Sequence, residues 1–62
     1  MDRQWLYLSA LRSAAKALGE ERLRQRLNVP AAALVAWLKR ERAIPEAVFL
    51  IAVDVLQERA RR

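Results

Sequence analysis

The side chains of this sequence that could do chemistry are its cations, and the chemistry open to them is the binding of polyanions. The chain has 12 Lys and Arg against 7 Asp and Glu, which gives a formal net charge of +5 at pH 7. Such an excess on a small domain attracts nucleic acid first and acidic membrane surfaces second. The same charge could also serve only to keep an apolar chain dissolved, so charge alone does not decide the function.

One group of cations lies near the end of a predicted helix and consists of Lys39, Arg40 and Arg42. Cations at this end of a helix are stabilised by the helix dipole, typically by about 0.3–1 kcal/mol. They would also lie near a phosphate if the helix entered a DNA groove. Both explanations can hold together.

A second pair, Arg22 and Arg26, lies four residues apart and therefore shares one face of an earlier helix. This pair could clamp a phosphate backbone, or it could belong to a solvated face. Glu20 and Glu21 precede it and weaken the local positive field, which favours the solvated face.

Candidates for catalysis or metal binding are scarce. The chain has no His and no Cys, so the commonest general base and metal ligand are both missing. The sequence places no general base near Ser9 or Ser13. The carboxylates of Asp54 and Glu58 have the pattern of ordinary surface charges. One glycine is too few for a glycine-rich phosphate loop. We therefore expect no enzyme, no metal site, no cofactor and no small-molecule substrate.

The element that must position the cations is a predicted corner between two helices. Leu23 and Leu27 share a helix face, so both can contact the next helix. Asn28 enters the left-handed region cheaply, which predicts the end of the first helix. Pro30 fixes φ at a helical value where the second helix begins. Val29, between them, is expected to fill the corner.

These residues resemble the helix-turn-helix of small phage-repressor proteins of the Cro and Xre type. In that form, Leu-Ala-x-x-Leu-Gly-Val-Ser precedes a reading helix with a buried bulky residue, followed by a polar turn, a proline and an apolar helix. The resemblance covers about residues 20–57 and implies a small dimeric protein that binds double-stranded DNA and could regulate transcription. The positions in step with the family are Leu23, Leu27, Val29, Leu34, Trp37, Pro45 and 48–56.

The chain departs from this family where DNA would be read. Arg24 replaces a small residue after the first leucine, and Asn28 replaces glycine. Pro30 replaces the hydroxyl that caps the reading helix, a loss of about 1 kcal/mol. The positions expected to face base edges are Pro30, Ala31, Ala32, Val35, Ala36 and Lys39.

Of these positions, only Lys39 has a side chain that can donate a hydrogen bond to a base. We therefore expect DNA binding mainly through the backbone, with steep salt dependence and weak base discrimination. The residues assigned to this surface are Arg22, Arg26, Ala31, Ala32, Val35, Ala36, Lys39, Arg40 and Arg42.

Composition and periodicity predict one all-α domain over residues 1–62, a compact bundle of four helices that contains the helix-turn-helix. One glycine and two prolines leave little room for loops or strands, and the residue types favour helix nearly throughout. Gly19 is expected to end the first helix, and Pro45 is expected to be the first residue of the last. The predicted helices span about 2–18, 20–27, 31–41 and 45–60.

Large apolar residues outside the expected core predict self-association. The core stripe of the first helix is Trp5, Leu8, Leu11, Ala15 and Leu18, and that of the last is Val48, Phe49, Ala52, Val55 and Leu56. Leu6, Leu50 and Ile51 lie outside these stripes. With Val35, they make more apolar surface than a monomer normally exposes. We therefore predict a homodimer through Leu6, Leu50 and Ile51.

Two functions compete on this scaffold. In the first, residues 31–42 face a DNA groove. In the second, a protein-interaction module without DNA readout, Ala32, Val35 and Ala36 receive a partner helix because small residues let helices approach closely.

Membrane-surface binding by the first helix is a minor third alternative, weakened because its apolar stripe is needed for the core. The longest uncharged apolar runs fall well short of the roughly 20 residues that span a bilayer. No segment has the pattern of a targeting signal. We therefore expect a cytoplasmic protein.

Overall fold

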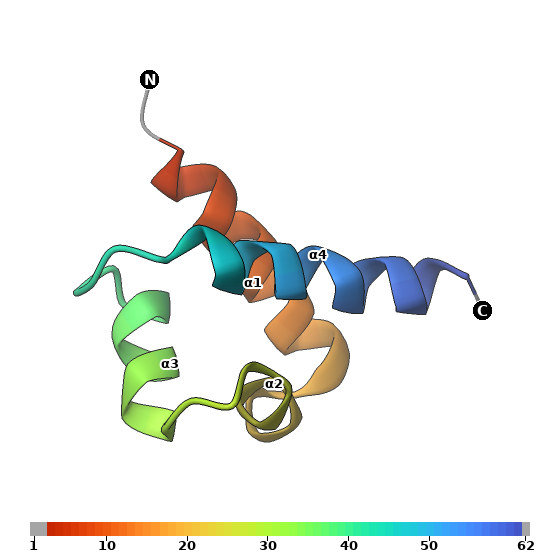
Figure 1. Ribbon diagram of the computed structural model, residues 1–62, viewed down its shortest axis with the longest axis horizontal. Coiled ribbons are helices and arrows are strands. Elements are labelled where there is room, and N and C mark those ends of the chain that lie inside the picture. Colours follow the sequence, from red (N-terminus) through yellow and green to blue (C-terminus); the bar gives the residue numbers. More distant parts are fainter. Residues whose placement is uncertain (1–2, 62) are drawn as a thin grey trace.

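Four helices and their short connections make up residues 3–61, the part of the chain that this computed structural model describes (Figure 1). The helices are α1 (Gln4–Leu18), α2 (Glu20–Leu27), α3 (Ala31–Leu38) and α4 (Glu46–Ala60). No strand occurs in these residues, so the all-α prediction is confirmed. The molecule measures 33 × 28 × 17 Å, and α4 crosses α1 while α2 and α3 lie together on one side of this pair (Figure 1).

Gly19 separates α1 from α2, as predicted. Its φ of 93° lies in a region that L side chains rarely adopt. Its N–H donates to the Ala15 carbonyl at 2.8 Å, and its own carbonyl accepts from the Leu23 N–H at 2.9 Å. One residue therefore ends a helix and begins the next. Helix α1 begins at Gln4 with Arg3 as its N-cap, and the predicted start at residue 2 lies outside the described residues.

The corner between α2 and α3 lies where the sequence places it. Asn28 is left-handed, with φ 58° and ψ 48°. The N–H groups of Asn28 and Val29 donate to the carbonyls of Gln25 and Arg24 at 3.1 and 3.3 Å. These two bonds form a Schellman motif, which closes the end of a helix. Val29 is partly buried against the core, as expected for the residue that fills the corner.

Helix α3 ends at Leu38, three residues before the predicted end at residue 41. Arg40 is left-handed, with φ 65°, and its N–H donates to the Trp37 carbonyl at 3.1 Å. The Glu41 N–H donates to the Ala36 carbonyl at 2.8 Å. This is a second Schellman motif, and the sequence did not indicate it because arginine seldom adopts this conformation.

The two prolines precede helices instead of beginning them. Pro30 and Pro45 have ψ of 153° and 149°, so each is extended and serves as an N-cap. Each proline carbonyl accepts N–H groups from the first turn of the helix that follows, at 3.0–3.4 Å. Pro45 is therefore the residue before α4, which corrects the prediction that it lies inside that helix.

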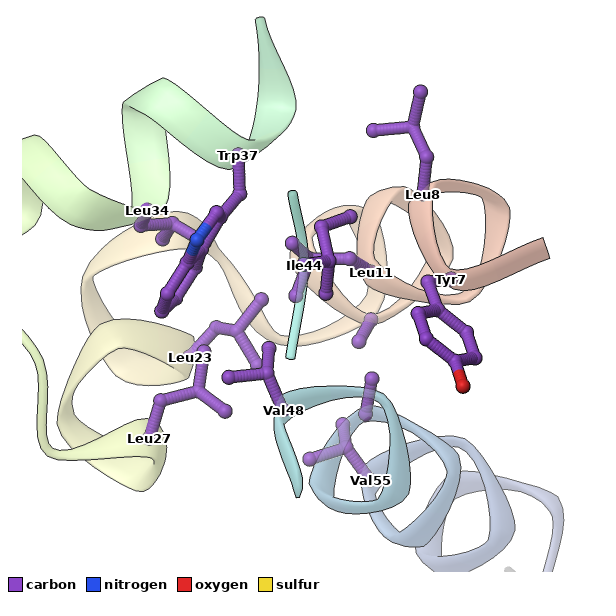
Figure 2. Close-up of a cluster of buried hydrophobic side chains, with 12 residues drawn as sticks. Tyr7, Leu8, Leu11, Leu23, Leu27, Leu34, Trp37, Ile44, Val48 and Val55 are labelled. Carbon is purple, nitrogen blue, oxygen red and sulfur yellow. The ribbon is translucent and has the colours of Figure 1, made fainter. Parts of the chain in front are cut away.

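The core lies among all four helices, and its side chains converge between α1, α2, α3 and α4 (Figure 2). Ile44, from the connection before α4, is 4% exposed and joins the core. The buried residues are Tyr7, Leu8, Leu11, Ala14, Leu23, Leu27, Leu34, Trp37, Ile44, Val48, Ala52 and Val55.

The predicted core stripe of α1 is wrong at its first position. Trp5 is 60% exposed, and Tyr7 is buried in its place. The Tyr7 ring stacks on Phe49 of α4, with ring centroids 4.6 Å apart. Helix α4 therefore covers the Tyr7 side of α1, and residues two apart on a helix point about 200° from each other. Trp5 is left on the other side for this reason.

Helix α4 also differs from the expected pattern at one residue. Leu50 is 56% exposed, as predicted. Ile51 is partly buried and packs against the core, which corrects its placement on the solvent side. The described helices are too short or too polar to reach across a lipid bilayer.

Candidate nucleic-acid interface

The solvent-facing side of α3 consists of small apolar side chains. Leu34 and Trp37 point from this helix into the core (Figure 2), where both are buried. Ala31, Ala32 and Val35 are exposed, and Ala36 is half-buried. As expected, the exposed face presents methyl groups to a partner and no hydrogen-bonding side chain before Lys39.

The connection after α3 holds the cations Lys39, Arg40 and Arg42, all of which are exposed. The left-handed conformation of Arg40 turns the chain sharply at the end of α3. Four residues later the chain is fixed again, because Ile44 is buried. The cations therefore lie on a short segment held at both ends.

The second end of this segment is held by a side chain from α1. The Gln4 amide donates to the Ile44 carbonyl at 3.1 Å and accepts the Ile44 N–H at 2.6 Å. Gln4 thereby satisfies both backbone groups of a buried residue, as a neighbouring strand would. Sequence reasoning missed this contact, because nothing local to Gln4 indicates a partner 40 positions away.

Helix α1 adds cations that the sequence analysis did not assign to the site. Arg12 and Arg40 line the same hollow of about 280 Å³, beside Trp5. Lys16 and Arg12 line the next hollow along α1, together with Glu20 of α2 and Leu38 at the end of α3. Their place on the polar side of α1 is visible in the sequence, but their proximity to Arg40 depends on how α1 and α3 pack.

Five cations thus lie along the side where α1 meets the end of α3. In the part of the chain that the structure describes, none of them forms an ion pair within 4 Å. Two carboxylates lie among them: Glu20 lines the hollow of Arg12 and Lys16, and Glu41 lines a hollow with Arg40 and Arg42. The set is Arg12, Lys16, Lys39, Arg40 and Arg42, and we call it the α1–α3 cation group.

The arginines of α2 are arranged differently. Arg26 makes a two-pronged pair with Glu58 of α4, Nη1 to Oε1 at 3.0 Å and Nη2 to Oε2 at 2.5 Å. The hydrogen bond to Glu58 raises the pKa of Arg26, and the charges of Glu58 and Asp54 act in the same direction. Arg22 and Arg26 line a hollow beside Leu18, at the corner of α1 and α2.

The cation beside the α2–α3 corner is Arg24. It lines the hollow that also includes Val29 and Pro30. Its guanidinium binds the Glu21 carboxylate, and this hydrogen bond lowers the pKa of Glu21. No residue of α3 lines the hollow of Arg22 and Arg26.

No family model, curated protein or solved structure matches this chain. A functional interpretation must therefore come from the residues and their arrangement. No group of three or more acidic side chains gathers within residues 3–61 in a way that could hold a metal ion.

Proposed function

We propose that this chain binds double-stranded DNA through α3 and the connection that follows it, mainly by contacts to phosphates. The observation that supports this most directly is the position of Lys39, Arg40 and Arg42. They lie exposed at the end of a helix whose outer face is open, without ion-pair partners in the described residues. Cations that form no ion pair can neutralise phosphates and release the counterions condensed on them.

The rigidity of the segment supports the same proposal. A binding group that is already held in place loses less entropy on association. The Schellman motif at Arg40 and the Gln4 bonds to Ile44 fix the chain on either side of the cations. The α3 backbone can approach DNA closely, because Ala31 and Ala32 have small side chains.

Base discrimination is expected to be weak. Alanine and valine can contact a thymine methyl group but cannot donate to or accept from a base. Lys39 alone could hydrogen-bond a base edge. The protein in this proposal is a helix-turn-helix DNA-binding protein that recognises the duplex by charge and shape, and any role in transcription would depend on where it is recruited.

The test is a titration of binding to random-sequence duplex DNA at several salt concentrations. The wild type should show a steep linear fall of log K with log salt. In the variant Lys39→Gln, Arg40→Asn, Arg42→Gln, the slope should become shallower by roughly 0.9 for each phosphate that the protein no longer neutralises. Asn is used at position 40 because it tolerates the left-handed conformation.

The matched control removes three exposed cations elsewhere, Arg22→Gln, Arg59→Gln and Arg61→Gln. Both variants lose three positive charges, so the control reproduces the loss of general attraction for DNA without changing the proposed surface. In the control, the slope of log K against log salt should become shallower by less than it does in the first variant. Equal slopes for the two variants would contradict the proposed surface, and no binding by the wild type at low salt would contradict DNA binding itself.

A second candidate is a protein-interaction module on the same scaffold. The observation in its favour is the exposed apolar face of α3, where Val35 is 37% exposed beside Ala31 and Ala32. A partner helix could pack closely on such small residues. Absence of DNA binding at low salt would favour this alternative.

A further inference from the structure

Two large apolar side chains in the described chain are more than half exposed. Trp5 is 60% exposed and Leu50 is 56% exposed. Single exposed leucines are common on protein surfaces. A tryptophan left largely in water is less usual, and tryptophan is enriched among the residues that dominate binding interfaces. The surroundings of these two residues differ in a way that makes them complementary.

Trp5 lies in a cationic environment. It lines the hollow of about 280 Å³ with Arg12 of α1 and Arg40 of the α3–α4 connection. Ser9 and Ser13 add hydroxyl groups to the same hollow, and among the described residues no carboxylate lines it. This site is called the Trp5 hollow below.

Leu50 lies in an acidic environment. Glu46 and Asp54 are four residues before and after it, so all three share the outer face of α4. All three are exposed, with Ala47 beside them. In the described part of the chain, neither carboxylate forms an ion pair within 4 Å. Glu46, Ala47, Leu50 and Asp54 are called the Leu50 strip below.

We infer that the Leu50 strip of one copy docks in the Trp5 hollow of a second copy. The leucine would cover the tryptophan, and the two carboxylates would face Arg12 and Arg40. Opposite charges on the two surfaces favour this pairing and disfavour the pairing of either surface with itself. The charge complementarity is what selects a second copy as the occupant.

The contact is head-to-tail because the two surfaces face different directions. Tyr7 stacks on Phe49 of α4, and Trp5 points to the other side of α1, away from α4. The Leu50 strip lies on α4 opposite the buried residues Val48 and Ala52. A copy that docks its strip on one neighbour therefore keeps its hollow free for another, so the contact repeats and gives an open chain or, where the rotation closes, a ring.

The association should be weak and sensitive to salt. Each surface has one large apolar residue and a few exposed charges, and exposed ion pairs contribute little to affinity. Their main effects are orientation and steering, which salt screens. This inference does not depend on DNA binding, but Arg40 belongs both to the Trp5 hollow and to the surface proposed for the duplex, so the two partners would compete for it.

Sedimentation equilibrium at low salt tests the inference. The weight-average mass of the wild type should rise with protein concentration up to the order of 1 mM. The mass should not level off at that of a dimer. Added salt should reduce the mass. Trp5→Ala and Leu50→Lys should each remain monomeric. Both positions are more than half exposed, so the fold should tolerate both changes.

Mixing the two variants gives the sharpest result. Trp5→Ala keeps its strip and Leu50→Lys keeps its hollow, so an equimolar mixture should form a 1:1 dimer that grows no further. The control is Leu6→Lys, at a third exposed apolar residue of α1, which should assemble as the wild type does.

Three outcomes would overturn the inference. A wild type that stays monomeric over this range would remove it. Failure of the mixture to form a dimer would exclude head-to-tail pairing. A wild-type dimer that Leu6→Lys disrupts would instead support the homodimer through Leu6, Leu50 and Ile51 that is predicted from the sequence.

Discussion

Helices α2 and α3 both have 8 residues and both end in a Schellman motif, but only the end of α2 can be predicted from the sequence. Asn28 occupies the left-handed position after α2, and Arg40 occupies it after α3. Asparagine adopts this conformation readily, whereas arginine meets a steric penalty in it. The first end follows from local preference and the second does not.

The difference between the two ends indicates what holds the second one. Beyond Arg40, the buried Ile44 and its two hydrogen bonds to Gln4 fix the chain. We infer that these tertiary contacts compensate for the unfavourable backbone conformation. The end that is held in this way is also the end that presents the cations proposed to bind DNA.

The largest expected change in the free energy of unfolding comes from removing the bulky side chain beside the C-terminal end of α3. Trp37 is 8% exposed and lines a hollow with Gln4, Arg40 and Ile44. Trp37→Ala should lower the free energy of unfolding by about 3–5 kcal/mol. That is a large part of the total for a chain of this size, since domains are stabilised by about 0.05–0.15 kcal/mol per residue. Urea unfolding followed by circular dichroism measures the change.

The matched control for Trp37→Ala is Val35→Ala, two residues away on the exposed face of α3. It should change the free energy of unfolding by at most about 0.5 kcal/mol. A loss as large as that of Trp37→Ala would mean that the Val35 face is packed in solution.

The next largest change in the free energy of unfolding is expected from removing the Gln4 hydrogen bonds to Ile44. Gln4→Ala leaves the Ile44 N–H and carbonyl without their partners, which should cost about 1–3 kcal/mol of unfolding free energy. Amide exchange at Ile44 should accelerate more than at Asn28, because only the second helix end depends on Gln4. Equal acceleration at both positions would argue against separate support for the two ends.

Gln4→Glu adds a pH-dependent version of this test. An ionised Glu can accept the Ile44 N–H but brings a charged oxygen to the Ile44 carbonyl, which raises the folded-state pKa of this Glu. The protonated acid can donate to that carbonyl. The variant should therefore be most stable below the ordinary pKa of Glu and lose stability as the pH rises, whereas Gln4→Ala should show no such change.

A smaller effect compares the two left-handed residues directly. Arg40→Gly should raise the free energy of unfolding by about 0.5–1 kcal/mol, because glycine removes the steric penalty at φ 65°. Asn28→Gly should change it less, since asparagine already tolerates this conformation. Arg40→Gly should also weaken DNA binding, so stability and binding should move in opposite directions. A loss of stability in Arg40→Gly would contradict the proposed strain.

The smallest expected change in stability comes from the ion pair between Arg24 and Glu21 of α2. Arg24 holds Glu21 and lowers its pKa. The stabilisation from this pair is therefore complete above the ordinary Glu pKa of 4.5 and is lost as the pH falls through the lowered folded-state value. Glu21→Gln should be slightly less stable than the wild type at pH 7 and equal to it in acid. A difference that persists in acid would assign the effect to something other than this charge.

The sequence predicted those features that depend on neighbouring residues. The four helices, the break at Gly19, the left-handed Asn28 and the partly buried Val29 all follow from local preference and apolar spacing. The exposed alanines of α3 follow in the same way.

The features that were missed depend on contacts between distant residues. Trp5 and Tyr7 have similar apolar character, and only the position of α4 decides which is buried. The early end of α3 at Leu38 depends on how the next residues are held. Of the candidate site, Lys39, Arg40 and Arg42 could be assigned from sequence, but the proximity of Arg12 to Arg40 could not.

The central claim is that DNA contacts the end of α3. The most direct test follows the backbone amides of the protein by NMR while random duplex DNA is added at low salt. The largest shift changes should occur at residues 31–32, 35 and 39–42, with little change over 46–54 on the outer face of α4. An absence of changes, or changes concentrated on α4, would contradict the proposed interface.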